Sequence, residues 1–408
     1  MSIVTVAGAN GQSVTLQFDT EANAALAARI AAAITAGVQN GTIAPATNVD
    51  NRPPPVPPGQ IGQFVQTNSG TTFLPPGYKA FIDTAPLSVV FGSGEADESV
   101  LSSIGQLNFF APSGSGTIVA GGGNTRVVIE GADTGGWSIN TGTGDDQILI
   151  MGSGNNTVSA GGGNNEISLG GGNSVVESTG NDTITGTQGQ ATVTAVGKTS
   201  DLIFGGSQLF YVGAGAGSAT IFGGSGADTF FGSIDPKAGP DVVHAGSAGG
   251  NLLVAGSGND TFFASPGNST ILGGSGNDSF VFTKGQGGST DLIQNFASGQ
   301  DTIDLQGYGK NEINNALKSQ TVTNGSVTIT LSDHTTITFA GITSLSASDF
   351  IATPGNGGGG NGMGGGNGMG GGNGMGGGND NDHGNGMMGH GDDDGSDMSH
   401  IRNMPGGH

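Results

Sequence analysis

The sequence contains no cysteine, which excludes disulfide bonds, thiolate metal sites and cysteine nucleophiles. Basic residues are scarce as well, because 10 Lys and Arg stand against 32 Asp and Glu, for a formal net charge of −22. A charge of this sign opposes binding to phosphate backbones and to anionic membranes, so we expect no nucleic-acid partner. No window approaches 18 consecutive apolar residues, and the start, MSIVTVAGANGQ, lacks the regions of a secretory signal. We therefore expect a soluble chain without membrane insertion or a Sec-type signal, whose natural partners are cations.

Glycine is the residue in excess, with 84 of 408 positions, roughly three times its average share. Collagen requires glycine at every third position together with abundant proline, and the 15 Pro of this chain do not meet that requirement. Aspartate beside glycine suits tight turns and also loops that bind a metal through oxygen, so composition alone leaves both interpretations open.

Residues 1–43 predict a small α+β unit. Apolar residues alternate on either side of an Asn-Gly pair at positions 10–11, which is typical of a β-hairpin. The Ala-rich run EANAALAARIAAAITA that follows favours one helix, capped by Asp19 or Thr20 and ended by Gly37. The helix carries an apolar stripe that needs a partner.

The rest of the chain divides by composition. Residues 44–85 predict a Pro-rich linker and the approach to the next region, because RPPPVPPG at 52–59 cannot be helical. Residues 86–281 consist of short apolar pieces separated by Gly, Asn, Ser and Asp, with clear nonapeptide units from 120. Residues 282–351 lose that period and predict a β capping region, whereas 352–408 is a low-complexity Gly/Met/His/Asp-rich tail expected to be disordered.

The nonapeptide units follow one another in frame. MGSGNNTVS is followed by AGGGNNEIS at 151–168, and AGSGNDTFF, ASPGNSTIL and GGSGNDSFV run consecutively over 255–281. A unit this small cannot bury its own apolar face, so the units must stack on their neighbours. The fold class predicted is all-β, a parallel β-roll or β-solenoid, with the eighth position of each unit pointing inward. These inward positions are Ile148, Val158, Ile167, Ile184, Ile221, Phe230, Phe262, Ile271 and Phe280.

Aspartate occupies the sixth position of several units. If two units make one coil, residues 18 apart lie above one another, and Asp260 and Asp278 have this separation. Their carboxylates would then lie about 4.8 Å apart along the ladder and repel each other. A hard cation completed by backbone carbonyls removes the repulsion, and Ca²⁺ suits this ligand set better than Mg²⁺. The sixth-position aspartates are Asp146, Asp182, Asp228, Asp260 and Asp278.

GGSGADTFF, AGSGNDTFF and GGSGNDSFV resemble the repeats-in-toxin (RTX) nonapeptide, Gly-Gly-x-Gly-x-Asp-x-apolar-x. The resemblance implies a parallel β-roll that binds Ca²⁺ between the loops of successive coils. It adds turn glycines to the predicted metal site, namely Gly223, Gly226, Gly256, Gly258, Gly273, Gly274 and Gly276.

Residues 273–305 and 339–351 further resemble the capping region of serralysin-type secreted proteins. This resemblance implies that Asp291, Asp301 and Asp304 join the terminal calcium site. Members of the family usually leave Gram-negative cells through a type I exporter that reads a C-terminal signal. The added tail leaves the position of such a signal open.

The middle of the predicted roll departs from the pattern, since the sixth position holds Asn156, Asn165, Ser174 and Ala191. Asn offers an oxygen without charge, and Ala offers none. This portion is expected to rely on Asn and Thr ladders and apolar stacking, with weak calcium sites or none. Alternatively, its Asn residues simply serve tight turns.

No catalytic motif emerges. The six His lack H-E-x-x-H spacing, and neither G-x-S-x-G nor a phosphate loop occurs, so no enzyme is expected and the serralysin protease domain is absent. The tail also holds Met and Asp residues together with His383, His390, His400 and His408, a set that suits Cu, Ni or Zn. The favoured interpretation of these residues is nevertheless a solvated flexible tail for spacing or adhesion.

The expected function is a secreted, extracellular or cell-surface calcium-binding structural protein, such as a coat, biofilm fibre or adhesin. We expect it to fold, and to associate with itself, on Ca²⁺ binding. The alternatives are a module that binds a surface polysaccharide and a polysaccharide-acting enzyme.

Overall fold

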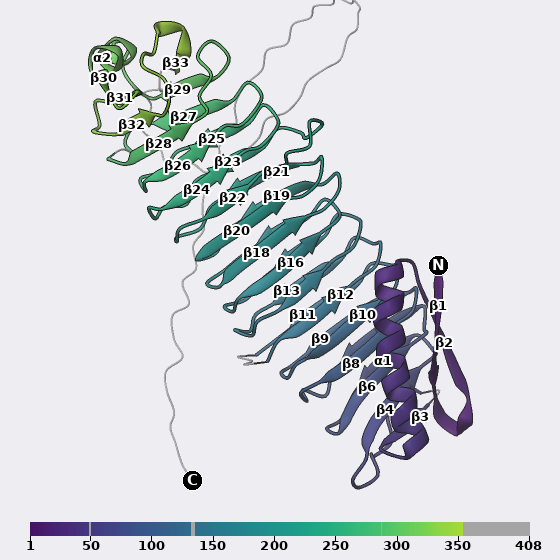
Figure 1. Cartoon of the computed structure of the whole chain (residues 1–408). Helices are drawn as coiled ribbons and strands as arrows, with labels where there is room; N and C mark the ends of the chain where they lie inside the picture. Colours follow the sequence, from purple (N-terminus) through teal and green to yellow (C-terminus); the bar gives the residue numbers. More distant parts are fainter. Residues whose placement is uncertain (49, 132–134, 287, 354–408) are drawn as a thin grey trace, which may run out of the picture. The chain divides into compact units, whose positions relative to one another are not determined.

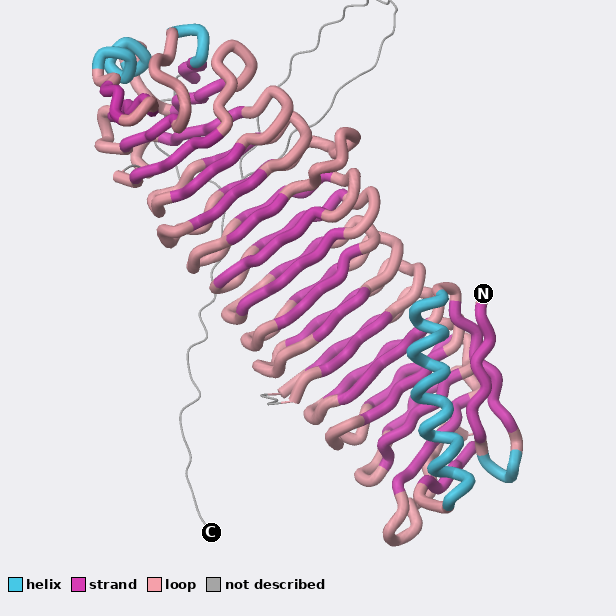
Figure 2. The backbone as a smooth tube through the Cα atoms, viewed as in Figure 1, coloured by secondary structure: helices cyan, strands magenta, loops and turns pink. Residues whose placement is uncertain are grey.

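The computed structural model describes residues 1–353 except 49, 132–134 and 287. These residues form a parallel β-solenoid of about 13 turns, in which the chain coils repeatedly between two facing sheets (Figures 1 and 2). The fold class predicted from the sequence is confirmed. In the part of the chain that the structure describes, no helix is long and apolar enough to cross a membrane.

Each coil contributes one strand to each sheet. The sheet of even-numbered strands, called the even sheet below, contains β4 (Ile61–Gln66), β6 (Tyr78–Asp83), β8 (Glu98–Ser102), β10 (Gly116–Ala120), β12 (Trp137–Asn140), β14 (Thr157–Ser159), β16 (Ser174–Ser178), β18 (Gln190–Ala195), β20 (Gln208–Gly213), β22 (Thr229–Phe231), β24 (Asn251–Val254), β26 (Ser269–Leu272) and β28 (Thr290–Gln294). The odd sheet contains β5 (Gly70–Phe73), β7 (Leu87–Phe91), β9 (Gln106–Ala111), β11 (Arg126–Ile129), β13 (Gln147–Ile150), β15 (Glu166–Ser168), β17 (Thr183–Thr185), β19 (Ser200–Phe204), β21 (Ser218–Phe222), β23 (Val242–His244), β25 (Thr261–Phe263), β27 (Ser279–Thr283), β29 (Thr302–Gln306) and β33 (Phe350–Thr353).

The core is a ladder of inward side chains between the two sheets. All nine eighth-position residues predicted to point inward are buried, with 2 % exposure or less. Phe262 lies opposite Phe280 of the next coil, and their rings stack with centroids 5.8 Å apart. Identical apolar positions in successive coils therefore build one continuous core.

The tight packing of this ladder predicts a modest but measurable cost for losing one methyl group. Ile167→Val is expected to lower the free energy of unfolding by about 1 kcal/mol, because Ile167 is fully buried. Ile3→Val makes the same chemical change at a side chain that is 69 % exposed, and should leave stability unchanged within about 0.5 kcal/mol. Urea unfolding of both variants in saturating Ca²⁺ measures the difference, and equal midpoints for the two would contradict the packing described.

The N-terminal unit is the hairpin of β1 (Ser2–Ala7) and β2 (Ser13–Phe18), joined by η1 (Ala9–Gly11) and followed by α1 (Glu21–Asn40). Thr20 caps the helix, since its side chain accepts a hydrogen bond from the Asn23 backbone N–H at 3.1 Å. The prediction that Gly37 ends the helix is wrong. The helix continues to Asn40, and Gly37 lets Ile43 pack closely, because a Cβ at Gly37 would lie 2.5 Å from Ile43 Cδ1.

The linker predicted over 44–85 is also corrected, because this segment forms the first coils of the solenoid. β3 (Ile43–Thr47) pairs in parallel with β4, and β4 pairs with β6. The Pro-rich stretch at 52–59 has neither helix nor strand, as its composition requires, but it connects two neighbouring strands of one sheet rather than two domains. These coils escaped prediction because they lack the glycine period that marks the later ones.

A small cap closes the C-terminal end, but it begins later than the predicted range 282–351, because β28 and β29 within that range still extend the two sheets. Its elements are α2 (Glu312–Lys318), β30 (Thr321–Thr323), β31 (Ser326–Thr330), β32 (Thr336–Phe339) and η2 (Ala347–Asp349). β31 and β32 form an antiparallel pair, and β32 also pairs in parallel with β28 of the even sheet. The predicted tail, apart from its first two residues, lies outside the described residues.

Candidate calcium-binding edge of the solenoid

A row of residues, polar in every coil but one, runs along one edge of the solenoid near the start of each odd strand. The strand registers place one such residue per coil directly above the next. The members of this acid row are Asp146, Asn165, Asp182, Asp201, Ala219, Asp241, Asp260, Asp278 and Asp301. The stacking of Asp260 and Asp278 predicted from their spacing is what the structure shows.

One oxygen of each stacked carboxylate ties its coil to the preceding coil. Asp278 Oδ1 accepts a hydrogen bond from the Asp260 backbone N–H at 3.0 Å, and Asp301 Oδ1 accepts one from the Asp278 N–H at 3.0 Å. Asp260 Oδ1 in turn accepts one from the Asp241 N–H at 2.7 Å. Three successive carboxylates are thus fixed by the backbone of the row itself.

The second oxygen of several of these carboxylates is buried without a hydrogen-bond partner. A buried anionic oxygen without a donor is costly, so these atoms require a partner that the protein itself does not supply. A hard cation meets this requirement, and carboxylate oxygens are the ligands that Ca²⁺ prefers. The residues of the row with such an Oδ2 atom are Asp146, Asp182, Asp201, Asp260 and Asp278.

Burial and mutual repulsion shift the protonation of the row. Burial, together with the charges of Asp260 and Asp301, raises the pKa of Asp278 to about 7. Burial and the charge of Asp260 raise the pKa of Asp241 to about 7, and burial raises the pKa of Asp260 as well. The row would therefore hold protons at near-neutral pH in the absence of a cation, and a bound cation would displace them.

Glycine shapes the turns beside these carboxylates. Gly256 and Gly274 have φ angles of 94° and 91°, which side-chain-bearing residues rarely adopt. A Cβ on Gly273 would lie 2.5 Å from Asp278 Oδ2, so the absence of a side chain keeps space open beside the unpartnered oxygen. Within the described ranges no three His, Cys, Asp or Glu side chains come together, so the remaining ligands of a cation would be backbone carbonyls.

Two of the predicted site residues lie on the opposite edge, at the even strands. Asp228 accepts hydrogen bonds from the Leu209 N–H and the Gly224 N–H, both at 2.7 Å, beside Gly223 and Gly226 of its own turn. Asp291 accepts bonds from the Ser269 N–H and the Ser289 hydroxyl. Both oxygens of each carboxylate are engaged, so these residues join coils without offering an unpartnered oxygen.

The terminal site predicted from Asp291, Asp301 and Asp304 is not assembled. Asp301 belongs to the acid row, but Asp291 lies on the opposite edge. Asp304 lies within β29, where the buried Ile303 and Leu305 alternate with it and place it on the outer face. Its Oδ2 accepts a hydrogen bond from Gln306 Nε2 at 2.9 Å.

The sequence did not reveal Asp201 and Asp241 as members of the row. Asp241 follows the insertion SIDPKAGP at 233–240, which lengthens its coil, so that Ile221 pairs with Val243 instead of a residue 18 positions later. The triplet Val-Val-His after Asp241 matches the strand pattern through its two valines and is the signal that could have identified Asp241.

In the middle of the roll, Asn replaces Asp without leaving unpartnered oxygens. Asn165 Oδ1 accepts a hydrogen bond from the Asp146 N–H at 2.9 Å, while its Nδ2 donates to Asp182 Oδ1 at 2.7 Å. On the other edge, Asn156 Oδ1 accepts a bond from the Trp137 N–H at 2.9 Å. These contacts are the amide ladder expected for this portion.

The ladder predicts a stability cost that does not depend on calcium. Asn165→Ala removes both bonds and leaves the Asp146 N–H buried, so we expect a loss of about 2 kcal/mol in the free energy of unfolding. Asn164→Ala, at the exposed neighbouring position, serves as the control. Thermal unfolding with and without Ca²⁺ should show the same loss for Asn165→Ala, and a loss seen only in Ca²⁺ would contradict a purely structural role.

The chain forms a parallel β-solenoid with glycine-rich turns. Along one edge of this solenoid, carboxylates with unpartnered oxygens lie one above another. These features together define the class of calcium-binding β-rolls. The sequence model of the RTX calcium-binding nonapeptide repeat (4 copies) matches residues 141–176, 214–235 and 238–281. The chain therefore carries RTX repeats on a β-roll, and its cofactor is Ca²⁺.

Among solved structures, the extracellular lipase LipA from Serratia marcescens is similar at 17 % identity, with a TM-score of 0.19, over 46 % of this chain and 40 % of that chain. The chain thus spans less than half the length of that lipase. The search of curated proteins found no match.

Proposed function

We propose that this protein is a secreted, calcium-binding structural protein of the cell surface or extracellular matrix that associates with itself through the outer faces of its β-roll. RTX repeats are typical of proteins secreted by Gram-negative bacteria, which supports an extracellular location. Calcium outside the cell is concentrated enough to fill sites of the millimolar class, so the roll would complete its folding after export. The proposal includes no catalytic role.

The proposal of self-association rests on a row of side chains on the outer face of the even sheet. One row of outward residues is apolar at the N-terminal coils, polar in the middle and apolar again towards the C-terminal coils. The N-terminal part is buried beneath the hairpin and α1. In order, the row contains Val65, Ile82, Leu101, Val119, Asn140, Ser159, Glu177, Thr194, Val212, Phe231, Val254 and Leu272.

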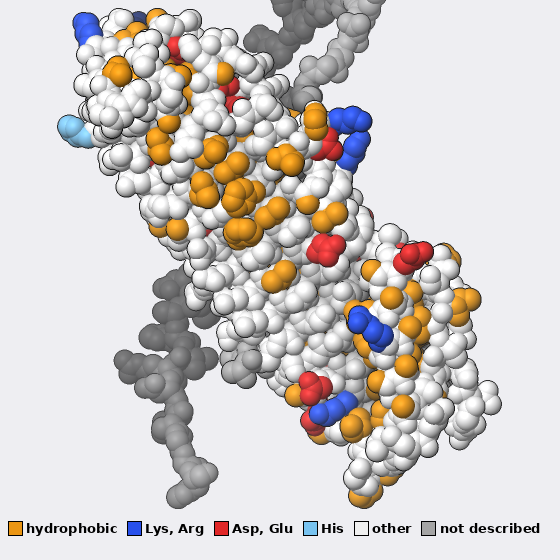
Figure 3. Space-filling view, in the orientation of Figure 1, with side chains coloured by type: hydrophobic (Ala, Val, Ile, Leu, Met, Phe, Trp, Pro, Cys, Tyr) orange, Lys and Arg blue, Asp and Glu red, His pale blue; other side chains and the backbone are white. Residues whose placement is uncertain are grey.

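The second apolar part of this row, Val212 to Leu272, is covered by no described element. Phe210, 41 % exposed, lies beside it, and hydrophobic side chains gather on this face towards the C-terminal coils (Figure 3). Exposed apolar patches of this kind mark protein contacts. The occupant we assign is a second copy of the chain, because the same row is already covered by apolar elements at its N-terminal end.

The odd sheet carries a comparable strip on its outer face. Phe222, His244 and Phe263 stack in parallel, with ring centroids 4.4 and 4.2 Å apart, and Phe204 extends the stack at 5.1 Å. Because the rings cover each other's faces, mainly ring edges reach the surface. A polysaccharide that stacks on aromatic rings needs exposed faces, so the strip favours a protein contact.

Sedimentation velocity in Ca²⁺ over a range of concentrations tests the proposal. We expect the wild-type chain to associate, and Phe210→Ser with Val254→Thr to sediment as a monomer with an unchanged β signal. Ile3→Ser, which removes a 69 % exposed side chain from the hairpin, is the matched control and should still associate. A wild-type monomer at every concentration would overturn the proposal, and binding of that monomer to insoluble polysaccharide would replace it with the carbohydrate-binding alternative.

A further inference from the structure

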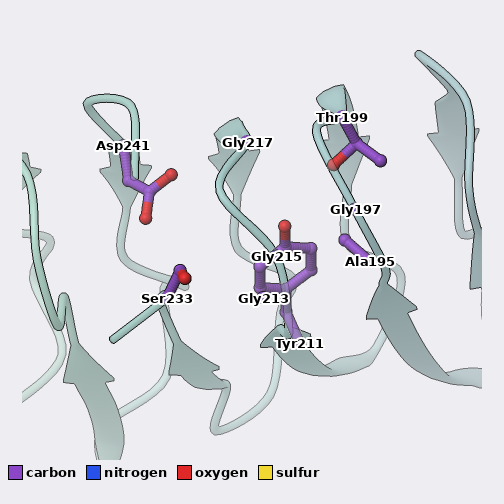
Figure 4. A pocket seen from close by; sticks show the side chains of 9 residues that line it. All are labelled: Ala195, Gly197, Thr199, Tyr211, Gly213, Gly215, Gly217, Ser233 and Asp241. Carbon is purple, nitrogen blue, oxygen red and sulfur yellow. The ribbon is translucent and has the colours of Figure 1, made fainter. Parts of the chain in front are cut away.

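A small interior cavity lies beneath the turns at the edge of the acid row. Its volume is about 10 Å³, room for a single water-sized sphere, so it cannot hold an organic ligand. Figure 4 shows the residues that line it, namely Ala195, Gly197, Thr199, Tyr211, Gly213, Gly215, Gly217, Ser233 and Asp241.

Tyr211 reaches this cavity from the opposite sheet. It belongs to β20, is 3 % exposed, and points its hydroxyl towards the turn that contains Gly215 and Gly217 (Figure 4). Its ring stacks on Phe230 with centroids 5.3 Å apart, which fixes its direction. No hydrogen bond joins the Tyr211 hydroxyl to another described residue, although the side chain as a whole is buried.

The cavity lies where the acid row is interrupted. Ala219 stands between Asp201 and Asp241, and its backbone N–H donates to Asp241 Oδ1 at 2.7 Å. Asp201 Oδ2 is buried without a partner. The coil of Ala219 therefore has no acid in the row. It lies between the coils of Asp201 and Asp241, and the Tyr211 phenol approaches it from the opposite sheet.

The electrostatics of the cavity favour a positive occupant. None of the nine lining residues is Lys, Arg or His. Burial raises the pKa of Tyr211, and the charges of Asp201 and Asp241 raise it further, which shows that the phenol lies in a negative potential. A cation is stabilised by this potential, whereas a neutral water molecule gains much less from it.

We propose that the cavity binds one calcium-sized cation, with the Tyr211 hydroxyl and Asp241 as ligands in place of the carboxylate that is absent at position 219. The cation would fill the gap in the acid row between Asp201 and Asp241. The metal-binding edge would then be continuous across the irregular coils. The site is independent of self-association, since all of its residues lie inside one roll.

Terbium luminescence of the full chain tests the site, because Tb³⁺ replaces Ca²⁺ and is excited by a phenol that lies beside it. The chain has three Tyr and one Trp, so few side chains compete. In Tyr211→Phe we expect most of the tyrosine-excited Tb³⁺ emission to disappear and the Ca²⁺ stoichiometry from equilibrium dialysis to fall by one. Tyr308→Phe, whose hydroxyl donates to Asp333 in the cap, is the matched control and should change neither.

A second variant separates loss of the site from loss of the fold. Ala219→Asp places a carboxylate where other coils of the row carry one, so Tyr211→Phe/Ala219→Asp should recover the lost Ca²⁺ without the Tb³⁺ emission. Circular dichroism establishes that each variant is folded. If Tyr211→Phe is folded and keeps both emission and stoichiometry, the cavity holds water and the proposal is overturned. If Tyr211→Phe does not fold, the wild-type chain provides the test. In that case, tyrosine-excited Tb³⁺ emission of the wild type that does not fall when Ca²⁺ is added would overturn the proposal.

Discussion

Removal of Ca²⁺ at about pH 8 is expected to unfold the C-terminal coils of the roll, whereas removal at about pH 5 should have a much smaller effect. The difference follows from the acid row. Asp241, Asp260 and Asp278 are buried one above another, and in the folded chain only a cation or a proton can neutralise them.

The sign of this dependence comes from the raised pKa values. Asp241 and Asp278 have a pKa of about 7 in the folded chain, and Asp146 and Asp201 of about 6, against about 3.9 for Asp in an unfolded chain. Between these values the folded state binds more protons than the unfolded state. The stability of the metal-free protein therefore falls as pH rises from about 4 to about 7. Stabilisation by Ca²⁺, which binds the ionised carboxylates, grows over the same window.

Circular dichroism during urea unfolding measures this effect, in chelator and in Ca²⁺ at both pH values, with Mg²⁺ as the control cation. Asp278→Asn keeps an oxygen that can accept the Asp260 N–H and removes one charge, so it should stabilise the metal-free protein at about pH 8 and weaken the response to Ca²⁺. Asp304→Asn makes the same change on the outer face of β29 and should do neither. A β signal that is complete in chelator at the higher pH and indifferent to Ca²⁺ would show that the row needs no cation.

The sequence predicted the solenoid because its repeat places an apolar residue at a fixed position of a very short unit. It could not predict coil length. Phe262 and Phe280 obey the 18-residue period, but Ile148 pairs with Ile167, and the coil with the insertion at 233–240 is longer still. Coils of unequal length can stack because the strands keep register while the turns absorb the extra residues.

The same limit explains which site residues could be predicted. Asp260 and Asp278 lie in the regular coils and were placed correctly, whereas Asp241 was hidden behind an insertion. Asp304 was expected in the terminal calcium site but lies on the outer face of a strand. The first coils were missed for a different reason. Their strands are mostly five or six residues long and their turns are mostly short, so the Gly-rich six-residue turn that marks the later coils is absent from them.

Gly276→Ala should be among the most destabilising single substitutions in the chain. A Cβ at this position would lie 1.5 Å from the Gly258 carbonyl oxygen of the preceding coil, and the backbone φ is +139°. The clashing atom is backbone, and both turns are fixed by the ladder spacing, so neither can move without breaking the pairing of β25 with β27. We expect a loss of at least about 4 kcal/mol, or failure to fold, with or without Ca²⁺.

Two control substitutions separate the clash from the backbone strain. Gly285→Ala has φ of +89° but nothing within 4 Å of the new Cβ, so it should cost only about 1 to 2 kcal/mol. Gly309→Ala has open space and no positive φ, and should leave the urea midpoint unchanged. If Gly276→Ala unfolded at the same urea concentration as Gly285→Ala, the close contact between successive turns would not exist. The stacked carboxylates would then lack the spacing that brings two of them to one cation.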